Sequence, residues 1–442
     1  MAGADLSPES TIGEELVSLV TCDLAGLVRG RSVPLADLDR HLEIGVGWVP
    51  VNQSISAFGD LAEPNPWGSA GDVRLMPDAP TRVRIERWPG IAPLHFMLCD
   101  ITEVDGSDWD ACGRTFLRRS LERLRRHAGL QVSASFEHEL VLESPGPAAP
   151  AFSLEAQRLA EPFGSQVMAA LREAGVEPEQ FLPEYGERQF EIPVAPAVGV
   201  AAADRSVVLK EVVREVARRL GRRVSFAPLQ DADAVGTGAH IHLSLVDEGG
   251  RPAGYDGARP GGLSLLAGRF AAGILRHLPA VLALTAPSPH SYARLVPHRW
   301  SAAAAVLGEQ NREATLRICP VVALGGMTAQ GQVHLEFRAA DATASPYLAL
   351  GALVSAGLEG IRQELDPPPV VEAGAPIASE PMRTALPASL GEALAALEAD
   401  PLARSWLPPR MLETYLGLKR LELSLVSDLE VEEVCRLYAR VH

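Results

Sequence analysis

Residues 132–142, VSASFEHELVL, decide the fold class, because apolar and polar side chains alternate along them. Successive side chains of a β-strand point to opposite faces of the sheet, so residues two apart share a face. The same alternation recurs in residues 189–194, 239–245 and 333–338. We therefore predict four strands of one sheet, with one face packed into a core and the other face polar.

The polar face of this predicted sheet carries carboxylates and histidines in place of the usual mixture of charges. Its members are Glu137, Glu139, Gln189, Glu191, His240, His242, Ser244, His334, Glu336 and Arg338. Carboxylates crowded in this way repel one another, and a hard divalent cation with oxygen ligands and an added imidazole removes the conflict. The pattern favours a metal site, and the alternative is an ordinary solvated face. His138 falls on the apolar face and is predicted to be a core histidine.

The composition is that of an ordinary globular protein, with 442 residues, 47% hydrophobic and 22% charged. The formal net charge of -16, from 56 acidic and 40 basic residues, argues against binding to nucleic acid or to an anionic membrane surface. The five cysteines are scattered without CxxC spacing, which favours a reducing compartment. Residues 1–12 contain no apolar run of the kind that directs export, so we expect a cytoplasmic protein.

The order of predicted elements indicates two domains. Residues 16–104 are rich in strand and turn signals, and a basic amphipathic helix follows at residues 114–127. We therefore predict a small domain over residues 1–107 and a large one over residues 108–442. A second helix is expected at residues 204–222. The apolar run 263–286 is interrupted by Arg269, Arg276 and His277, which favours a buried helix over a membrane span.

Six ordered motifs resemble those of the glutamine synthetase family. They are FEHE (136–139), EYGERQFE (184–191), GAHIHLS (238–244), SYARLVP (291–297), NREATLR (311–317) and EFRAAD (336–341). The resemblance extends to DLAG (23–26), RGR (29–31) and LMPDAPT (75–81) near the N-terminus, so it covers essentially the whole chain.

The resemblance implies an α+β fold, in which a small β-grasp-like N-terminal domain joins a large catalytic domain with a curved antiparallel sheet flanked by helices. It implies an ATP-dependent ligase that activates a carboxylic acid, such as glutamate, as an acyl phosphate and couples it to an amine. The expected cofactors are Mg²⁺ or Mn²⁺, two or three per active site, with ATP as co-substrate. The expected assembly is a homo-oligomer, a dodecamer of two hexameric rings whose sites are shared between neighbouring subunits.

Motif positions also imply roles for individual residues. One divalent ion would be held by Glu139, Glu184 and Glu191, and a second by Glu137, His240 and Glu336. The nucleotide residues would be His242, Ser244, Arg312 and Arg317, whereas Glu179 is either close to the nucleotide or a solvated loop residue. The substrate residues would be Gly236, Arg294, Arg338 and Trp300. The residues closest to the chemistry would be Arg312, Arg294 and Glu191.

The departures from the family pattern concern the substrates. True glutamine synthetases place an ammonium-binding Glu in the loop after the SYARLVP motif, where this chain has HRWS (298–301) with Trp300. A second acidic residue of the ammonium site has no counterpart in residues 51–59. Trp300 could line an apolar pocket, so the sequence favours an amine larger than ammonia. Val235 stands where many members have an Asn that contacts the amino acid, so the acid can be glutamate or a relative of it.

Other functions remain open from the sequence. One alternative is an authentic glutamine synthetase that uses ammonia, and another is an inactive family member with a structural or regulatory role. A metallohydrolase built on His240 and His242 is the third, although it would need fewer carboxylates and no arginine cluster.

Overall fold

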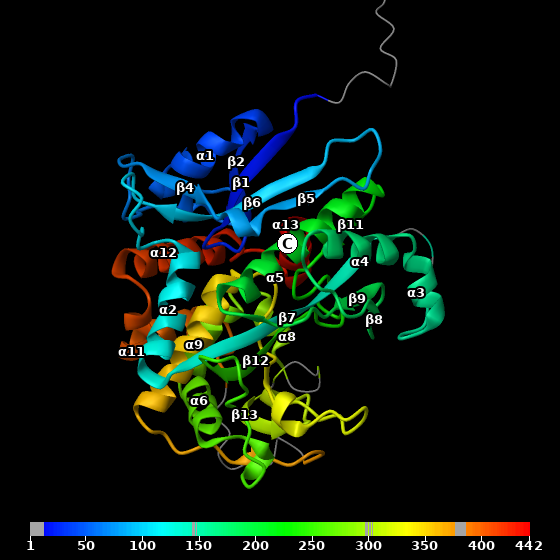
Figure 1. Cartoon of the computed structure of the whole chain (residues 1–442), viewed down its shortest axis with the longest axis vertical. Coiled ribbons are helices and arrows are strands. Elements are labelled where there is room, and N and C mark those ends of the chain that lie inside the picture. The colour runs from blue at the N-terminus through cyan, green and yellow to red at the C-terminus, as the bar shows by residue number, and fades with distance from the viewer. Residues whose placement is uncertain are drawn as a thin grey trace, which may run out of the picture.

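The computed structural model describes residues 13–143, 146, 148–296, 299, 302, 304–375 and 386–442. Figure 1 shows a smaller sheet domain, in blue, above a larger body built around a second sheet. The smaller sheet has the order β2-β1-β6-β4-β3, with β5 paired to β6. Its elements are β1 (Leu16–Cys22), β2 (Val28–Pro34), η1 (Leu35–Asp37), α1 (Leu38–Ile44), β3 (Val46–Trp48), η2 (Pro50–Ser54), β4 (Val73–Pro77), η3 (Ala79–Thr81), β5 (Val83–Ile85) and β6 (Leu94–Thr102).

The larger sheet has the order β16-β13-β14-β15-β12-β7-β9-β8, with β10 and β11 also paired to β7. Its strands are β7 (Leu130–Glu143), β8 (Leu182–Pro183), β9 (Gln189–Ile192), β10 (Ala197–Val198), β11 (Arg223–Ser225), β12 (Ala239–Asp247), β13 (Ala304–Glu309), β14 (Ala314–Ile318), β15 (Leu335–Phe337) and β16 (Val370–Val371). The four predicted strands are β7, β9, β12 and β15, and their pairs are antiparallel. Strand β13 adds parallel pairs with β14 and β16 at one edge, so the sheet is mixed.

Strand β7 confirms the alternation from which the fold was predicted. Every second residue from Leu130 to Leu142 is buried, and the residues between them are more exposed. His138 is buried on the apolar side, where its Nε2 lies 2.7 Å from the hydroxyl of Ser206 on α5. The prediction of a core histidine is therefore confirmed.

Helices follow the smaller sheet in the chain and accompany the larger one. In order they are α2 (Gly113–Ala128), α3 (Leu154–Ala160), α4 (Phe163–Glu173), α5 (Val200–Arg219), η4 (Pro260–Gly262), α6 (Leu265–Arg276), α7 (Leu278–Thr285), α8 (Ser291–Arg294), η5 (Ala329–Gly331), α9 (Pro346–Arg362), α10 (Leu390–Ala399), α11 (Pro401–Trp406), α12 (Pro409–Leu425) and α13 (Val431–Val441). Helices α2 and α5 lie against β7, and the predicted helices 114–127 and 204–222 correspond to them. Helix α2 ends at Gly129, whose φ of 65° suits a glycine C-cap.

The apolar run 263–286 forms two helices, whereas the sequence predicted a single buried one. Helices α6 and α7 meet at a bend of 78°. Pro279 lies in the first turn of α7, where a proline ring is tolerated, although it would break the interior of a continuous helix. In the described part of the chain no single helix is long and apolar enough to span a membrane, and only this bent pair passes by length and composition.

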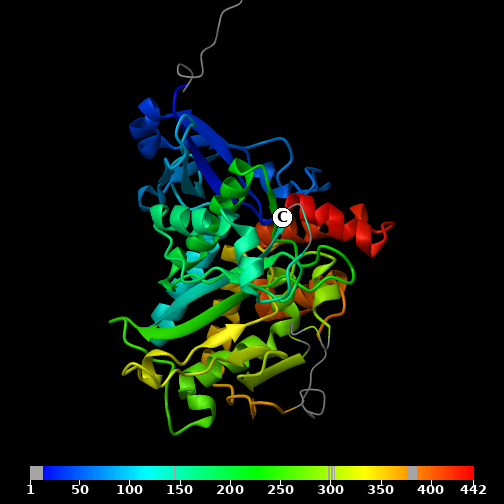
Figure 2. The same cartoon turned by 90° about the vertical axis from the view of Figure 1, so that its right-hand side faces the viewer.

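The C-terminal helices connect the two domains. Figure 2 shows α12 and α13, in red, at the level where the smaller domain meets the larger body. The side chain of Glu422 on α12 accepts a hydrogen bond of 3.0 Å from the backbone N–H of Ala57. The indole of Trp67 donates to Thr414 on the same helix at 2.9 Å. The smaller domain is thus held by side chains from the far end of the chain.

Arg114, at the start of α2, is the centre of a buried ion network between the domains. Its guanidinium lies 2.6 Å from Asp78 and 3.2 Å from Asp100 in the smaller domain, and 2.9 Å from Asp204 on α5. The Arg114 side chain is only 5% exposed, so its loss would leave Asp78 and Asp204 without their cation, whereas Asp100 would keep Arg118 at 2.6 Å.

We expect Arg114→Ala to lower the free energy of unfolding by about 3–5 kcal/mol, because removing one partner of a buried ion network leaves uncompensated charge. Urea unfolding followed by circular dichroism measures the change. Arg119→Ala is the matched control: Arg119 is 42% exposed and pairs with Asp108 and Asp110 at the surface, so about 1 kcal/mol or less should be lost. Equal midpoints for the two variants would contradict the prediction.

Candidate active site

The register of four strands brings the predicted metal ligands together. His240 on β12 lies opposite Glu137 on β7, and Glu139 on β7 lies opposite Glu191 on β9. Glu336 on β15 lies opposite His242, two residues further along β12. Side chains that face one another on paired strands are close neighbours, so an alternating sequence and this register are sufficient to build the cluster.

His240 lies at the centre of the cluster. Its Nδ1 is 3.8 Å from a Glu137 oxygen and 3.6 Å from a Glu336 oxygen, and its Nε2 is 3.8 Å from Glu139. Nδ1 is buried and has no hydrogen-bond partner among the described residues. Ligand atoms of Glu137, Glu191 and His240 all lie within 4.8 Å of one another. This donor set fits a divalent cation with carboxylate and imidazole ligands.

The electrostatics of the carboxylates point to the same conclusion. Burial, and then the negative charges of Glu137 and Glu139, raise the pKa of Glu191 far above its ordinary value. Burial and Glu139 raise the pKa of Glu184 to about 7. Burial also opposes ionisation of Glu137, but the neighbouring imidazole of His240 and the hydrogen bond from His242 outweigh it and hold the Glu137 pKa well below the ordinary range. A positive charge among these groups would allow all of them to ionise together.

Glu139 is oriented by two donors. Its Oε2 accepts hydrogen bonds from the amide of Gln189 at 2.8 Å and from the backbone N–H of Gly238 at 2.9 Å. The same Gln189 amide donates to the carbonyl of Gly236 at 2.9 Å. The sequence placed Gln189 on the polar face but gave it no role, and the structure shows that it fixes a predicted ligand.

Arginines border the cluster on the β14 and β15 side. Arg317 lies 2.7 Å from Glu336, and Arg338 is hydrogen-bonded to the same carboxylate. Burial opposes ionisation of Glu336, but the positive charges of Arg338, His240, His242 and Arg317 lower its pKa to about 2. Glu336 is therefore held as an anion.

Arg294 is buried, and it reaches the cluster because two glycines leave room for it. Its Nη2 donates to the backbone carbonyl of Arg338 at 2.9 Å. A Cβ atom on Gly236 would lie 2.7 Å from Arg294 Cγ, and one on Gly238 would lie 2.8 Å from Arg294 Nη2. Any other residue at these positions would displace the arginine.

The other residues predicted for the active site differ in how deeply they are buried. Glu184 is half-buried after β8, within electrostatic reach of Glu139, and Ser244 is half-buried on β12. Arg312 is exposed, and its carbonyl accepts a 3.0 Å hydrogen bond from Arg338 Nε. Glu179 is exposed, and none of the described contacts joins its side chain to the cluster. Trp300 lies outside the described residues.

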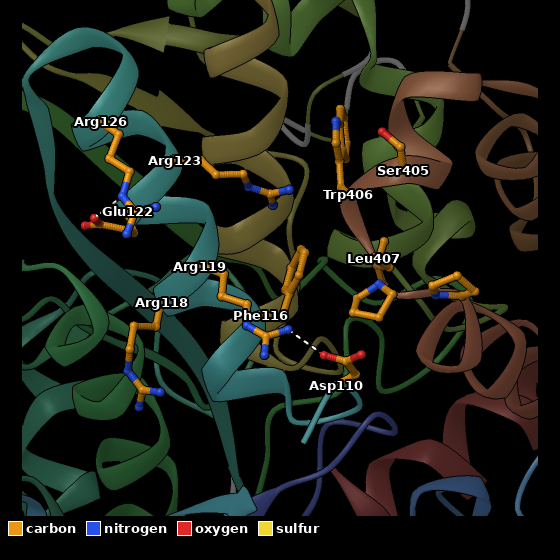
Figure 3. Close-up of a pocket in the computed structure, with 12 residues that line it drawn as sticks. Asp110, Phe116, Arg118, Arg119, Glu122, Arg123, Arg126, Ser405, Trp406 and Leu407 are labelled. Carbon is orange, nitrogen blue, oxygen red and sulfur yellow. Dashed lines mark hydrogen bonds and ion pairs between the residues drawn. The ribbon is translucent and has the colours of Figure 1, made fainter. Parts of the chain in front are cut away.

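A cavity of about 530 Å³ lies apart from this cluster, between α2 and residues 405–409. Figure 3 shows its basic lining, including Arg123 and Arg126, and the pairing of Arg119 with Asp110 at 2.6 Å. None of the residues predicted for the active site lines this cavity. The predicted metal ligands therefore gather on the sheet face and not at this cavity.

Two family models together match nearly the whole chain. Residues 7–109 match the glutamine synthetase N-terminal domain, and residues 110–435 match the glutamine synthetase catalytic domain.

Individual relatives match over similar lengths. The chain is 35% identical over 438 residues to a gamma-glutamylpolyamine synthetase, GlnA3, of Streptomyces coelicolor, covering 96% of this chain and 92% of that protein. It is 30% identical to a glutamine synthetase of Halobacterium salinarum, covering 93% and 90%. Among solved structures, one described as a novel glutamine synthase homolog is 49% identical, with a TM-score of 0.92 and coverage of 98% and 100%.

Proposed function

Because the chain belongs to the glutamine synthetase family and is an ATP-dependent, amide-forming ligase, we propose that it joins glutamate, or a related acid, to an amine larger than ammonia. The observation that carries the proposal is the cluster of Glu137, Glu139 and Glu191 around His240, bordered by Arg317 and Arg338. Such a site can neutralise the negative charge of a phosphoryl group that meets a carboxylate.

The proposed reaction has two steps. A carboxylate oxygen of the acid attacks the γ-phosphorus of ATP, which forms an acyl phosphate and releases ADP. The amine nitrogen then attacks the acyl carbon, so that phosphate leaves, the amide forms and the nitrogen loses a proton. Acyl phosphates react with amines readily because phosphate is a good leaving group.

We propose a role for each residue of the cluster. Two or three Mg²⁺ or Mn²⁺ ions, held by Glu139, Glu184 and Glu191 and by Glu137, His240 and Glu336, would supply positive charge at the phosphates. Arg312 and Arg317 would bind the transferring phosphoryl group, and His242 and Ser244 the nucleotide. Arg294 and Arg338 would hold the carboxylates of the acid beside Gly236. Glu179 has the weakest support, since its side chain is exposed.

The size of the amine is proposed from two observations. Trp300 stands where ammonia-using members of the family have an anionic residue, and a relative with 35% identity is a gamma-glutamylpolyamine synthetase. An amine with an alkyl or aryl part can be held by burial of that part, whereas ammonium needs anionic or carbonyl partners.

The test of the proposed reaction is the release of ADP in the presence of ATP, Mg²⁺, glutamate and one amine at a time, taken from ammonia, ethanolamine, polyamines and aromatic amines. We expect fast release only when both an acid and an amine are present. No release under any combination would support the inactive alternative. ADP release that is independent of an acid and an amine would contradict ligation.

Arg338→Lys should lower kcat/KM for the acid by about one to two orders of magnitude, because lysine keeps the charge but loses a two-point hydrogen bond worth roughly 1.5–3 kcal/mol. The KM for ATP should change little. Initial rates over a range of acid concentrations measure the effect, and Arg276→Lys at an exposed position of α6 is the control. An unchanged dependence on the acid would place Arg338 outside its binding site.

We also propose that the domain boundary lies at residues 107/108 and that the protein acts in the cytoplasm as a dodecamer of two hexameric rings. Sites shared between the N-terminal domain of one subunit and the catalytic domain of the next are heterologous contacts, which close into rings. Multi-angle light scattering should give a mass near twelve times 47.1 kDa. An active monomer would contradict the shared site.

A further inference from the structure

A second group of metal-binding side chains adjoins the carboxylate cluster. It consists of His242 on β12, Cys319 immediately after β14 and His334 immediately before β15, and their ligand atoms lie within 4.8 Å of one another. The Nδ1 atom of His242 is 3.0 Å from Nε2 of His334 and 4.0 Å from the sulfur of Cys319. Cys319 is buried and both histidines are half-buried. Three neighbouring strands therefore hold two imidazoles and one thiol together.

The orientation of each imidazole is fixed by an acceptor on its outer side. Nδ1 of His334 lies 2.6 Å from the backbone carbonyl of Gln332, and a carbonyl can only accept, so this nitrogen carries a proton. Nε2 of His242 lies 2.8 Å from a Glu137 oxygen, which accepts in the same way when Glu137 is ionised.

The two inner nitrogens, Nδ1 of His242 and Nε2 of His334, face one another across 3.0 Å and share a hydrogen bond. A metal ion that binds between them would displace the proton of this hydrogen bond. Metal-bound histidines in proteins show this same arrangement, with the outer N–H donated to a carboxylate or a backbone carbonyl.

We propose that Cys319, His242 and His334 bind one borderline-soft transition-metal ion, of which Zn²⁺ is the representative. With a Zn–S distance of about 2.3 Å and Zn–N distances of about 2.0–2.1 Å, a tetrahedral site needs a separation of roughly 3.3 Å between nitrogens and roughly 3.6 Å from sulfur to nitrogen. The observed 3.0 and 4.0 Å require shifts of less than half an ångström.

The thiolate of Cys319 distinguishes this site chemically from the carboxylate cluster. A thiolate selects zinc and similar ions over magnesium, whereas carboxylates suit Mg²⁺ and Mn²⁺. Three protein ligands leave a fourth tetrahedral position for water or for a ligand atom. The carboxylate of Glu336, 3.6 Å from the Cys319 sulfur, lies between the two groups and faces both. The site is thus a soft-metal position beside a hard-metal position.

Cobalt(II) is a suitable probe, because it adopts the same geometry as zinc and gives a sulfur-to-metal charge-transfer band in the near ultraviolet when a thiolate binds it. The full-length protein is treated with a chelator, dialysed and titrated with Co²⁺ in excess Mg²⁺, which competes with cobalt for the carboxylate cluster, while the band itself reports only cobalt bound to a thiolate. We expect one equivalent per chain to produce the band. His334→Gln should weaken binding by about tenfold or more, since loss of supporting groups alone costs that much.

Cys319→Ser should lose the band altogether, whereas Cys435→Ser should keep it, because Cys435 is an equally buried thiol on α13. Absence of the band in the wild type, or its persistence in Cys319→Ser, would overturn the proposal. The titration contains no ATP, acid or amine, so its failure would leave the proposed ligase activity untouched.

Discussion

Replacing Glu191 with alanine should reduce ATP turnover at least about a thousandfold, because metal charge at the phosphates contributes several kcal/mol and each 1.36 kcal/mol is a factor of ten in rate. The variant should nevertheless fold. Burial and the neighbouring carboxylates raise the pKa of Glu191 in the folded protein. Folding at neutral pH therefore requires this carboxyl, ionised in the unfolded chain, to take up a proton, and its removal takes away that cost. Steady-state ADP release and thermal unfolding, measured on the same preparation, separate the two effects.

The matched control is Glu143→Ala, because Glu143 is an exposed carboxylate at the end of the same strand β7 as Glu137 and Glu139. It should retain full turnover. A chelator should abolish the activity of the wild type, Mg²⁺ or Mn²⁺ should restore it, and Zn²⁺ should not. Full activity of Glu191→Ala, or of the wild type in excess chelator, would refute the assignment of these residues as metal ligands.

Trp300→Glu should narrow or reverse the preference for an organic amine over ammonia. A buried methylene contributes about 0.8 kcal/mol, so an alkyl chain with four methylenes gains ~3 kcal/mol, or more than a hundredfold in kcat/KM. A carboxylate at this position would remove apolar surface and offer ammonium an anionic partner. The ratio of kcat/KM values for the two amines measures the effect.

Trp300→Phe is the control, since it keeps an aromatic ring and should keep the preference. If Trp300 only packs its own loop, Trp300→Glu would lower the activity with both amines by the same factor and leave their ratio unchanged. That outcome would remove Trp300 from the amine site.

The sheet and its cluster could be predicted because both depend on a period of two. The alternation in residues 132–142 fixes which side chains of β7 share a face, and the pairing with β9, β12 and β15 follows from similar patterns. The parallel pairs of β13 could not be predicted in this way, because alternation carries no information on strand direction. The bend between α6 and α7 has a sequence signal in Pro279. A single helix was predicted because the apolar composition of residues 263–286 was given more weight than this proline.

The contacts of Gln189 and Cys319 could not be predicted from the sequence. Gln189 shares the polar face with Glu139, but its hydrogen bonds to Glu139 and Gly236 depend on the path of the loop before β12. Cys319 follows the last residue of β14, and only the antiparallel pairing of β14 with β15 brings it to His242 and His334. The positions of these residues in the sequence do not predict that they lie together in the fold.

The central claim, ligation of an acid to an amine larger than ammonia, is tested most directly by a competition. The wild-type protein is incubated with ATP, Mg²⁺, glutamate and equal concentrations of ammonia and a polyamine, and the products are identified by mass spectrometry. We predict that the γ-glutamylpolyamine, the amide of glutamate with the polyamine, accumulates far faster than glutamine. Glutamine as the dominant product, both here and when each of the other organic amines replaces the polyamine, would contradict the claim.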